Sequence, residues 1–309
     1  MRNTKTIGYL LGAFSIIVWG VTFVSTKALL TDFSALEILL FRFVAAYVAL
    51  WIIRPKVEKI PFKENIIFML AGLSGVVVYQ FAENTAISYT SCSNVSIIVS
   101  LCPMLTAVIA QIFLKEKHIT PWFVIGFVIA ITGVAMVTLN GYGTLEFNPK
   151  GDFLAFFAAV CWGFYSLCVS VINRHKYDSI CSTRRIFFYA LIFMIPWVLF
   201  GTKASPDSPS YFTFDADTNI SRFSSLANIF NTLFLGVVAS ALCFCAWNKA
   251  CNIIGTVRIS AGIYLIPVVT ILFAHIFLGE NLSLMGGVGA VLVIAGLFLS
   301  GRKKKNNNN

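Results

Sequence analysis

The sequence predicts an all-α membrane protein of ten transmembrane helices, arranged as two inverted five-helix repeats. Three observations carry this prediction: the composition, the length of the apolar runs and an internal repeat. Of the 309 residues, 58% are hydrophobic and 12% are charged, whereas a soluble domain has about 25% charged residues. The apolar runs are about 20 residues long, which is the length that crosses a hydrocarbon core about 30 Å thick.

Apolar runs between polar breaks give the ten predicted spans. They cover about 7–30, 34–53, 66–88, 92–114, 120–139, 152–172, 183–200, 226–248, 256–278 and 282–300. The first run lacks an A-x-A-like cleavage site, so we expect a retained helix and not a signal peptide. The longest connection, 201–225, is rich in Asp, Ser and Pro, which predicts a partly mobile loop or a short surface helix.

The basic residues are distributed unevenly between the two sides of the predicted bundle. With the N-terminus in the cytoplasm, 14 Lys and Arg residues fall in cytoplasmic segments, and Lys150, Lys203 and Arg222 fall on the opposite side. This asymmetry follows the positive-inside rule and predicts that both termini are cytoplasmic. It also accounts for the net charge of +10 without nucleic acid as a partner.

One sequence pattern occurs twice along the chain. Segments 103–116, PMLTAVIAQIFLKE, and 267–280, PVVTILFAHIFLGE, share seven of fourteen residues at an offset of 164. Further matches recur in the same order in both halves. They are Trp19-Gly20 with Trp162-Gly163, Arg42 with Arg185, Asn84 with Asn248, Ser96 with Ser260, and Gly126 and Gly133 with Gly289 and Gly296.

These ordered matches predict a division of the chain into two copies of one unit. The first copy covers 1–145, the second covers 149–300, and a cytoplasmic basic and Asn-rich tail covers 301–309. Each copy has five spans, an odd number, so the second copy enters the membrane from the opposite side.

The quoted motifs resemble the EamA-type metabolite exporters, ten-helix members of the drug/metabolite transporter superfamily. The resemblance rests on the WG pair of both first helices, the arginine in LLFRFVAAY, the two proline-to-glutamate segments and the glycines of both closing helices. It covers about residues 7–300. It implies a fold and a class of activity, while the substrate stays open, because relatives move amino acids, nucleobases, sugar conjugates and drugs.

Two prolines stand near the centres of the fourth and ninth predicted spans. A proline inside a helix removes a backbone hydrogen bond and kinks the helix. Because Pro103 and Pro267 occupy equivalent points in the two copies, we expect paired hinges, with a static kink as the alternative. Inverted repeats favour alternating access to a binding site near the midplane.

Arg42 is a charged residue well inside the second predicted span. It lies about eight residues into the second span, which is about 12 Å at 1.5 Å per residue. A charge at this depth is expensive unless it is paired. Either it binds a substrate carboxylate, or it pairs with Glu37 or helix-end carbonyls and is structural.

A polar face in the third span is the second candidate. Tyr79, Gln80 and Glu83 lie at i, i+1 and i+4, and Asn84 follows directly. Glu83 either holds a substrate amine and exchanges protons, or is an interfacial carboxylate near the outer boundary.

The remaining candidates are hydroxyl and aromatic side chains. Ser96, Ser100 and Tyr264 lie on polar faces that either line a pathway or pack helices together. Aromatic walls are expected from Trp19, Trp162, Tyr165 and Trp247, with Trp19 and Trp162 meeting near the pseudo-two-fold axis. Glu116 and Glu280 are expected to be structural.

The sequence and the resemblance together predict a secondary transporter in the cytoplasmic membrane. We expect it to export small amphipathic metabolites such as amino acids, with protons as a candidate coupling partner and without a cofactor. The sequence has no G-x-x-x-x-G-K-[ST] segment, so direct ATP drive is not indicated. The alternatives are a channel and an intramembrane enzyme. No suitably spaced nucleophiles, metal ligands or acid/base pairs favour an enzyme, and none of the eight cysteines forms a C-x-x-C pair.

Overall fold

The computed structural model describes residues 2–90, 92–115, 118–139, 148–269, 272–273 and 283–300, and this part of the chain contains helices and no strand. The prediction of an all-helical membrane protein is confirmed. Seven helical stretches of the described chain are long and apolar enough to cross a membrane: Thr4–Leu29, Ala35–Ile53, Phe62–Tyr89, Val95–Leu114, Pro149–Arg174, Ser179–Gly201 and Leu226–Ile254. Three shorter apolar helices are Pro121–Val137, Thr256–Val269 and Leu284–Ser300. The number of spans and their orientation stay predictions, and Glu116 and Glu280 lie outside the described residues.

The helices of the described chain pack into one bundle around a shared core. The α-helices are α1 (Arg2–Leu29), α2 (Ala35–Ile53), α3 (Phe62–Ala71), α4 (Tyr79–Tyr89), α5 (Cys92–Val99), α6 (Cys102–Leu114), α7 (Pro121–Leu139), α8 (Pro149–Arg174), α9 (Ser179–Gly201), α10 (Ala216–Phe223), α11 (Leu226–Leu233), α12 (Cys243–Ile254), α13 (Thr256–Ser260) and α15 (Leu284–Ser300). Two π-helices, η1 (Gly72–Val78) and η2 (Phe234–Leu242), and one 3-10 helix, η3 (Ala261–Leu265), interrupt longer helical stretches.

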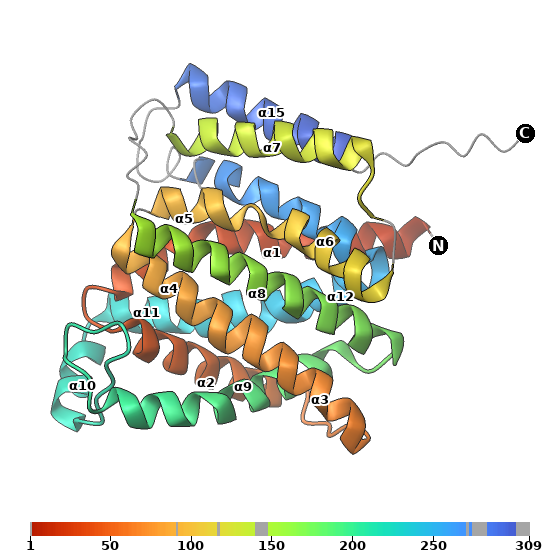
Figure 1. The fold of residues 1–309 in the computed structure, drawn as a ribbon. Coiled ribbons are helices and arrows are strands. Elements are labelled where there is room, and N and C mark those ends of the chain that lie inside the picture. The colour runs from red at the N-terminus through yellow and green to blue at the C-terminus, as the bar shows by residue number, and fades with distance from the viewer. Residues whose placement is uncertain are drawn as a thin grey trace, which may run out of the picture.

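The bundle has two distinct ends. In Figure 1, α7 and α15 form one edge of the molecule, α2 and α9 form the opposite edge, and α1, α4, α8 and α12 lie between them. The short helix α10 lies at one end of the bundle, and α3 and the N-terminus lie at the other. We call these the α10 end and the α3 end.

The core of the bundle is aromatic, and its outer faces are apolar. Phe43 of α2 meets Phe187 of α9 edge-to-face at 5.0 Å, and Phe244 of α12 lies 5.4 Å from Phe187. All three are fully buried. Large apolar side chains such as Phe200 and Val291 are exposed, as a surface that faces lipid requires.

The two π-helices occupy equivalent places in the molecule. Gly72 opens η1 and Gly236 lies in η2, 164 positions later. A Cβ atom added at Gly72 would lie 2.7 Å from the Ile186 carbonyl oxygen of α9, and one at Gly236 would lie 2.9 Å from the Arg42 carbonyl oxygen of α2. The missing side chains therefore let each π-helix contact the backbone of a helix from the other half of the chain.

The predicted fourth and ninth spans are both interrupted. The fourth divides into α5 and α6 at Ser100 and Leu101, and Pro103 lies in the first turn of α6, where a proline costs no hydrogen bond. In the ninth, η3 separates α13 from a helical segment that includes Pro267. Both prolines thus lie at helix breaks, and their role as hinges stays a prediction.

The closing helices α7 and α15 pack against each other through glycines. A Cβ atom at Gly126 would lie 2.6 Å from the Gly296 carbonyl oxygen, and one at Gly133 would lie 2.6 Å from that of Gly289. Small residues of this kind allow helix backbones to touch inside a membrane. Tyr264 of η3 joins the small apolar cluster beneath this pair.

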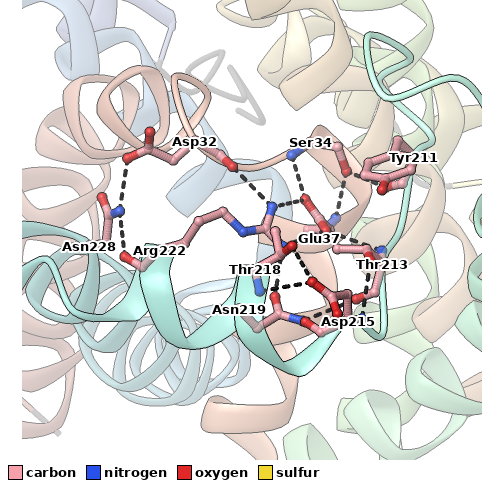
Figure 2. Close-up of polar contacts among 10 residues, drawn as sticks. All are labelled: Asp32, Ser34, Glu37, Tyr211, Thr213, Asp215, Thr218, Asn219, Arg222 and Asn228. Atoms are coloured by element: carbon pink, nitrogen blue, oxygen red, sulfur yellow. Dashed lines mark hydrogen bonds and ion pairs between the residues drawn. The ribbon is translucent and has the colours of Figure 1, made fainter.

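The connection 201–225 contains the short helix α10, one of the two forms that its sequence predicted. Figure 2 shows how this connection is fastened to the start of α2: both guanidinium Nη atoms of Arg222 lie 3.0 Å from the Glu37 carboxylate oxygens. The Glu37 side chain is fully buried, and it also accepts from the backbone N–H groups of Ser34 and Thr213. Arg222 therefore anchors the loop, and Glu37 does not pair with Arg42.

A second set of contacts fastens the α3 end. Arg184 of α9 is buried, donates hydrogen bonds to the carbonyl oxygens of Arg54 and Lys56, and stacks over the Trp51 ring at 3.8 Å. Arg54 also forms an ion pair of 3.7 Å with Asp178, the N-cap residue of α9. The connection that follows α2 is thus held against the start of α9.

Candidate functional site

A cavity of about 40 Å³ lies inside the bundle, where the helix interruptions converge. It lies nearer the α10 end, because Arg42 is in the first half of α2 and Glu83 is six residues before the end of α4. One water molecule needs about 10–15 Å³ of such space, so the cavity has room for only a few waters. Its lining comes from eight labelled elements and the helical segment after η3: Trp19, Thr22, Phe23, Arg42, Tyr79, Gln80, Glu83, Val99, Cys102, Trp162, Phe244, Ile263 and Ile266.

Arg42 is held in this cavity by one neutral side chain from each π-helical region. Its Nε donates to the hydroxyl of Ser240 in η2 at 2.5 Å, and its Nη1 donates to the amide oxygen of Gln80, just after η1, at 2.8 Å. The residue is 3% exposed. Within the described residues, none of the ion pairs includes Arg42. Since a guanidinium has five N–H donors, this buried cation keeps capacity for an anionic ligand.

Glu83 places the opposite charge at the same cavity. Its carboxylate accepts a hydrogen bond of 2.7 Å from the Tyr79 hydroxyl, and both residues line the cavity with Gln80. The face predicted for this span is therefore the face that lines the cavity. Arg42 and Glu83 attract each other electrostatically without direct contact, so the cavity presents a cation and an anion to whatever enters it.

Tryptophan rings close the cavity near the centre of the bundle. Trp19 and Trp162 meet edge-to-face at 5.5 Å, as expected from the sequence. Trp162 also lies 5.0 Å from the Tyr79 ring, and Trp247 lies 5.0 Å from Trp19. The Trp19 indole N–H donates to the Ala239 carbonyl oxygen, whereas the buried Trp162 indole N–H has no hydrogen-bond partner among the described residues.

The structure brings together six of the twelve residues that the sequence predicted for the site. Trp19, Arg42, Tyr79, Gln80, Glu83 and Trp162 line the cavity. The other six are not among the lining residues: Asn84, Ser96, Ser100, Tyr165, Trp247 and Tyr264.

The six residues outside the lining have other surroundings. Tyr165 packs against Trp162, and Trp247 packs against Trp19, both on the side of the cavity that faces the α3 end. The Ser100 hydroxyl donates to the Ser96 carbonyl oxygen of the preceding turn. Tyr264 is fully buried near Phe127, which fits a packing role.

Sequence reasoning missed Ser240, Thr22, Phe244 and Cys102. Ser240 carries a detectable signal, because it is a hydroxyl in the middle of an otherwise apolar run. Phe244 and Cys102 carry none, since apolar and thiol side chains are ordinary in membrane spans. Their place at the cavity depends on the π-helix and on the break before α6.

The EamA-like transporter family model matches residues 6–139 and 149–302 of the chain. An uncharacterized transporter of Archaeoglobus fulgidus is 25% identical over 98% of this chain and 99% of its own length. A probable terminal-alkyne amino-acid exporter of Streptantibioticus cattleyicolor is 23% identical and covers 98% of this chain and 95% of its own. A probable amino-acid metabolite efflux pump of Salmonella typhimurium is 25% identical, and the match covers 92% of this chain and 91% of that protein.

The fold also resembles a solved crystal structure. That chain has 16% sequence identity and a TM-score of 0.72, and the match covers 95% of this chain and 96% of the other. At this identity the similarity shows the fold alone.

Proposed function

Because the chain belongs to the EamA-like transporter family, we propose that it is a secondary transporter that exports small amphipathic metabolites, amino acids among them, across the cytoplasmic membrane. The observation that carries this proposal is the pair of opposite charges, Arg42 and Glu83, at one cavity inside the bundle. A zwitterion matches them, with its carboxylate at Arg42 and its amine at Glu83. Two of the relatives described above are named as an amino-acid exporter and an amino-acid metabolite efflux pump.

The proposed mechanism is alternating access by two inverted five-helix repeats, 1–145 and 149–300. Two observations support it. The family model matches the chain twice, and the π-helices and the interrupted spans recur at corresponding places. In this arrangement the chain has ten spans with both termini in the cytoplasm. The α3 end is then cytoplasmic and the α10 end is outside, consistent with the excess of Lys and Arg in segments at the α3 end.

The small size of the cavity favours a carrier over a channel. Pockets that hold small molecules measure about 300–1,000 Å³, and this cavity measures about 40 Å³. A substrate therefore fits only after the helices separate, as alternating access requires. A channel needs a continuous polar path, and the packed rings of Trp19, Trp162 and Trp247 obstruct one.

Glu83 is the proposed site of proton coupling. A substrate amine and a proton would compete for its carboxylate, so that the substrate leaves as a proton enters. In the Glu83→Gln variant, transport in proteoliposomes should no longer respond to an imposed pH gradient. A variant that responds like the wild type would remove Glu83 from the coupling.

Transport by purified protein in liposomes tests the proposed function. We expect amino-acid flux that saturates and is stimulated by substrate on the opposite side, whereas a channel gives neither. Arg42→Gln should raise the KM for a carboxylate substrate about 10- to 100-fold, the effect of losing a hydrogen bond to a charged group. The matched control is Lys203→Gln, which changes an exposed charge outside the helices. Equal KM values in both variants would contradict the assignment of Arg42.

A further inference from the structure

A chain of buried hydrogen bonds lies between the cavity and the α3 end. The Tyr165 hydroxyl of α8 donates to the Asn248 amide oxygen of α12 at 2.8 Å, and the Asn248 amide NH₂ donates to the Thr183 hydroxyl of α9 at 3.0 Å. All three residues are buried. Tyr165 is one turn beyond the cavity residue Trp162, and Asn248 is one turn beyond Phe244. The chain therefore ties three helices together directly beneath the site.

The equivalent positions on the other side of the cavity do not form such a chain. Thr22 follows Trp19 by three residues, as Tyr165 follows Trp162, and Asn84 precedes Asn248 by 164. The Thr22 hydroxyl donates to the Trp19 carbonyl oxygen within its own helix. The Asn84 amide NH₂ is buried and has no hydrogen-bond partner among the described residues.

The position equivalent to Thr183, the third residue of the hydrogen-bond chain, differs in chemistry as well. Gly236 contacts the backbone at Arg42 and Ala46, and Gly72 contacts it at Ile186 and Ala190. By these contacts Ile186, and not Arg185, occupies the place of Arg42.

Three residues earlier in each helix, Thr183 then corresponds to Leu39. Leucine has no hydroxyl, so a chain on the α10 side has at most one of the two bonds.

We propose that Tyr165, Asn248 and Thr183 form the lock that holds the α3 end closed, and that Thr22 and Asn84 form its counterpart when the α10 end closes. The inference rests on the proposed alternating access. Its physical basis is the unpaired Asn84 amide, because a buried donor without a partner carries a desolvation cost that a second conformation can remove. The α1 and α4 helices already meet near the α10 end, where the Lys27 ammonium donates to the Ile87 carbonyl oxygen at 3.2 Å.

The two locks are unequal in the number of side-chain hydrogen bonds that they can form. The α3 lock has two side-chain hydrogen bonds, whereas the α10 lock can form at most one, because Leu39 stands at the position equivalent to Thr183. The closed state at the α3 end is therefore favoured when the cavity is empty. Occupation of the cavity has to offset this difference before the molecule opens towards the α3 end.

Side-specific labelling of Cys102 tests the inference, because this thiol lines the cavity. An impermeant maleimide is added to sealed vesicles of either orientation, and peptide mass spectrometry measures the fraction of Cys102 modified. Tyr165→Phe removes one neutral bond of the α3 lock and keeps the ring. It should increase labelling from the α3 side about fivefold, the ratio for about 1 kcal/mol. Thr22→Val should increase labelling from the α10 side instead.

Controls separate the lock from general loosening. Asn252→Ala breaks the exposed hydrogen bond between Asn252 and Asn173 near the α3 end and should label like the wild type. If Tyr165→Phe does not fold, Thr183→Val removes the other bond of the same lock. Wild-type labelling of the folded α3-lock variant, or equal labelling of Thr22→Val and Asn252→Ala, would overturn the inference. Substrate flux in the same vesicles tests the proposed function independently, since wild type without flux refutes transport and not the lock.

Discussion

At each end of the bundle, an arginine from a connection between helices pairs with a carboxylate at the start of another helix. The two pairs differ greatly in burial and therefore in expected strength. At the α10 end, Arg222 from the connection after α9 pairs with Glu37 in the first turn of α2. At the α3 end, Arg54 from the connection after α2 pairs with Asp178 at the start of α9. The first pair is buried and bidentate, whereas the side chains of the second are 46% and 34% exposed.

This difference shows that equivalent places in the fold need not have equivalent energetics. The Glu37 carboxylate is fully buried, so it depends on Arg222 for compensation of its charge. At the α3 end the strong contacts are those of Arg184 with backbone carbonyl oxygens, and the ion pair is secondary. We therefore expect the stability of the α10 end to depend on one residue and that of the α3 end to be shared among several.

The largest expected effect comes from Arg222→Met. It leaves the buried Glu37 carboxylate without its cation, and breaking a buried pair in this way costs about 3–5 kcal/mol. Chemical unfolding of the purified protein in detergent measures the loss. Lys203→Met, an exposed site in the same connection, serves as the control and should change stability little. A loss below about 1 kcal/mol for Arg222→Met would mean that the pair is solvated.

Arg184→Met should have the next largest effect, about 2 kcal/mol, because it removes charge-assisted hydrogen bonds to two carbonyl groups. Arg184→Lys should recover only part of the loss, since an ammonium lacks the planar fork and the stacking on Trp51. The same unfolding experiment measures both variants. Full recovery with lysine would show that charge alone, and not geometry, fastens the α3 end.

Arg54→Ala should cost less than about 1 kcal/mol, as partly exposed ion pairs do. Screening by salt weakens such pairs, so the difference from the wild type should shrink between about 0.05 M and 0.5 M salt. A cost as large as that of Arg222→Met would remove the proposed inequality between the two ends.

The smallest expected effect is the change in stability at acidic pH that depends on the Asp178 carboxylate. Partial burial acts to raise the pKa of Asp178, but hydrogen bonds from the N–H groups of Cys181 and Ile180 and the Arg54 charge outweigh it and lower the pKa. The ionised carboxylate thus stabilises the fold above its unfolded pKa of about 3.9, and this contribution is lost as the pH falls through the folded pKa. The stability difference between wild type and Asp178→Asn should be constant from about pH 5 to 8 and shrink below about pH 4. A difference that persists in acid would assign the effect to capping alone.

The sequence predicted the helices and about half of the candidate site. Long apolar runs fix where helices lie, and charges or aromatic rings within such runs, such as Arg42 and Glu83, are conspicuous because lipid does not tolerate them unpaired. The π-helices could not be predicted, because the residue types that form a wide π-helical turn are the same as those that form an ordinary α-helical turn. The pairing of Glu37 with Arg222 could not be predicted either, since it joins positions 185 residues apart.

The π-helices also make the chain sensitive to a particular kind of genetic change. Deleting one residue within 72–78 would shorten the span by only about 1.5 Å, and the helix would still cross the membrane. However, a π-helical turn holds one residue more than an α-helical turn, so the deletion would convert it to α-helix and remove the wide turn that precedes Gln80 and Glu83. A one-residue deletion in the long connection 202–215 moves no helix face. Relatives that differ in length should therefore gain and lose residues in that connection and keep the length of the π-helical segments.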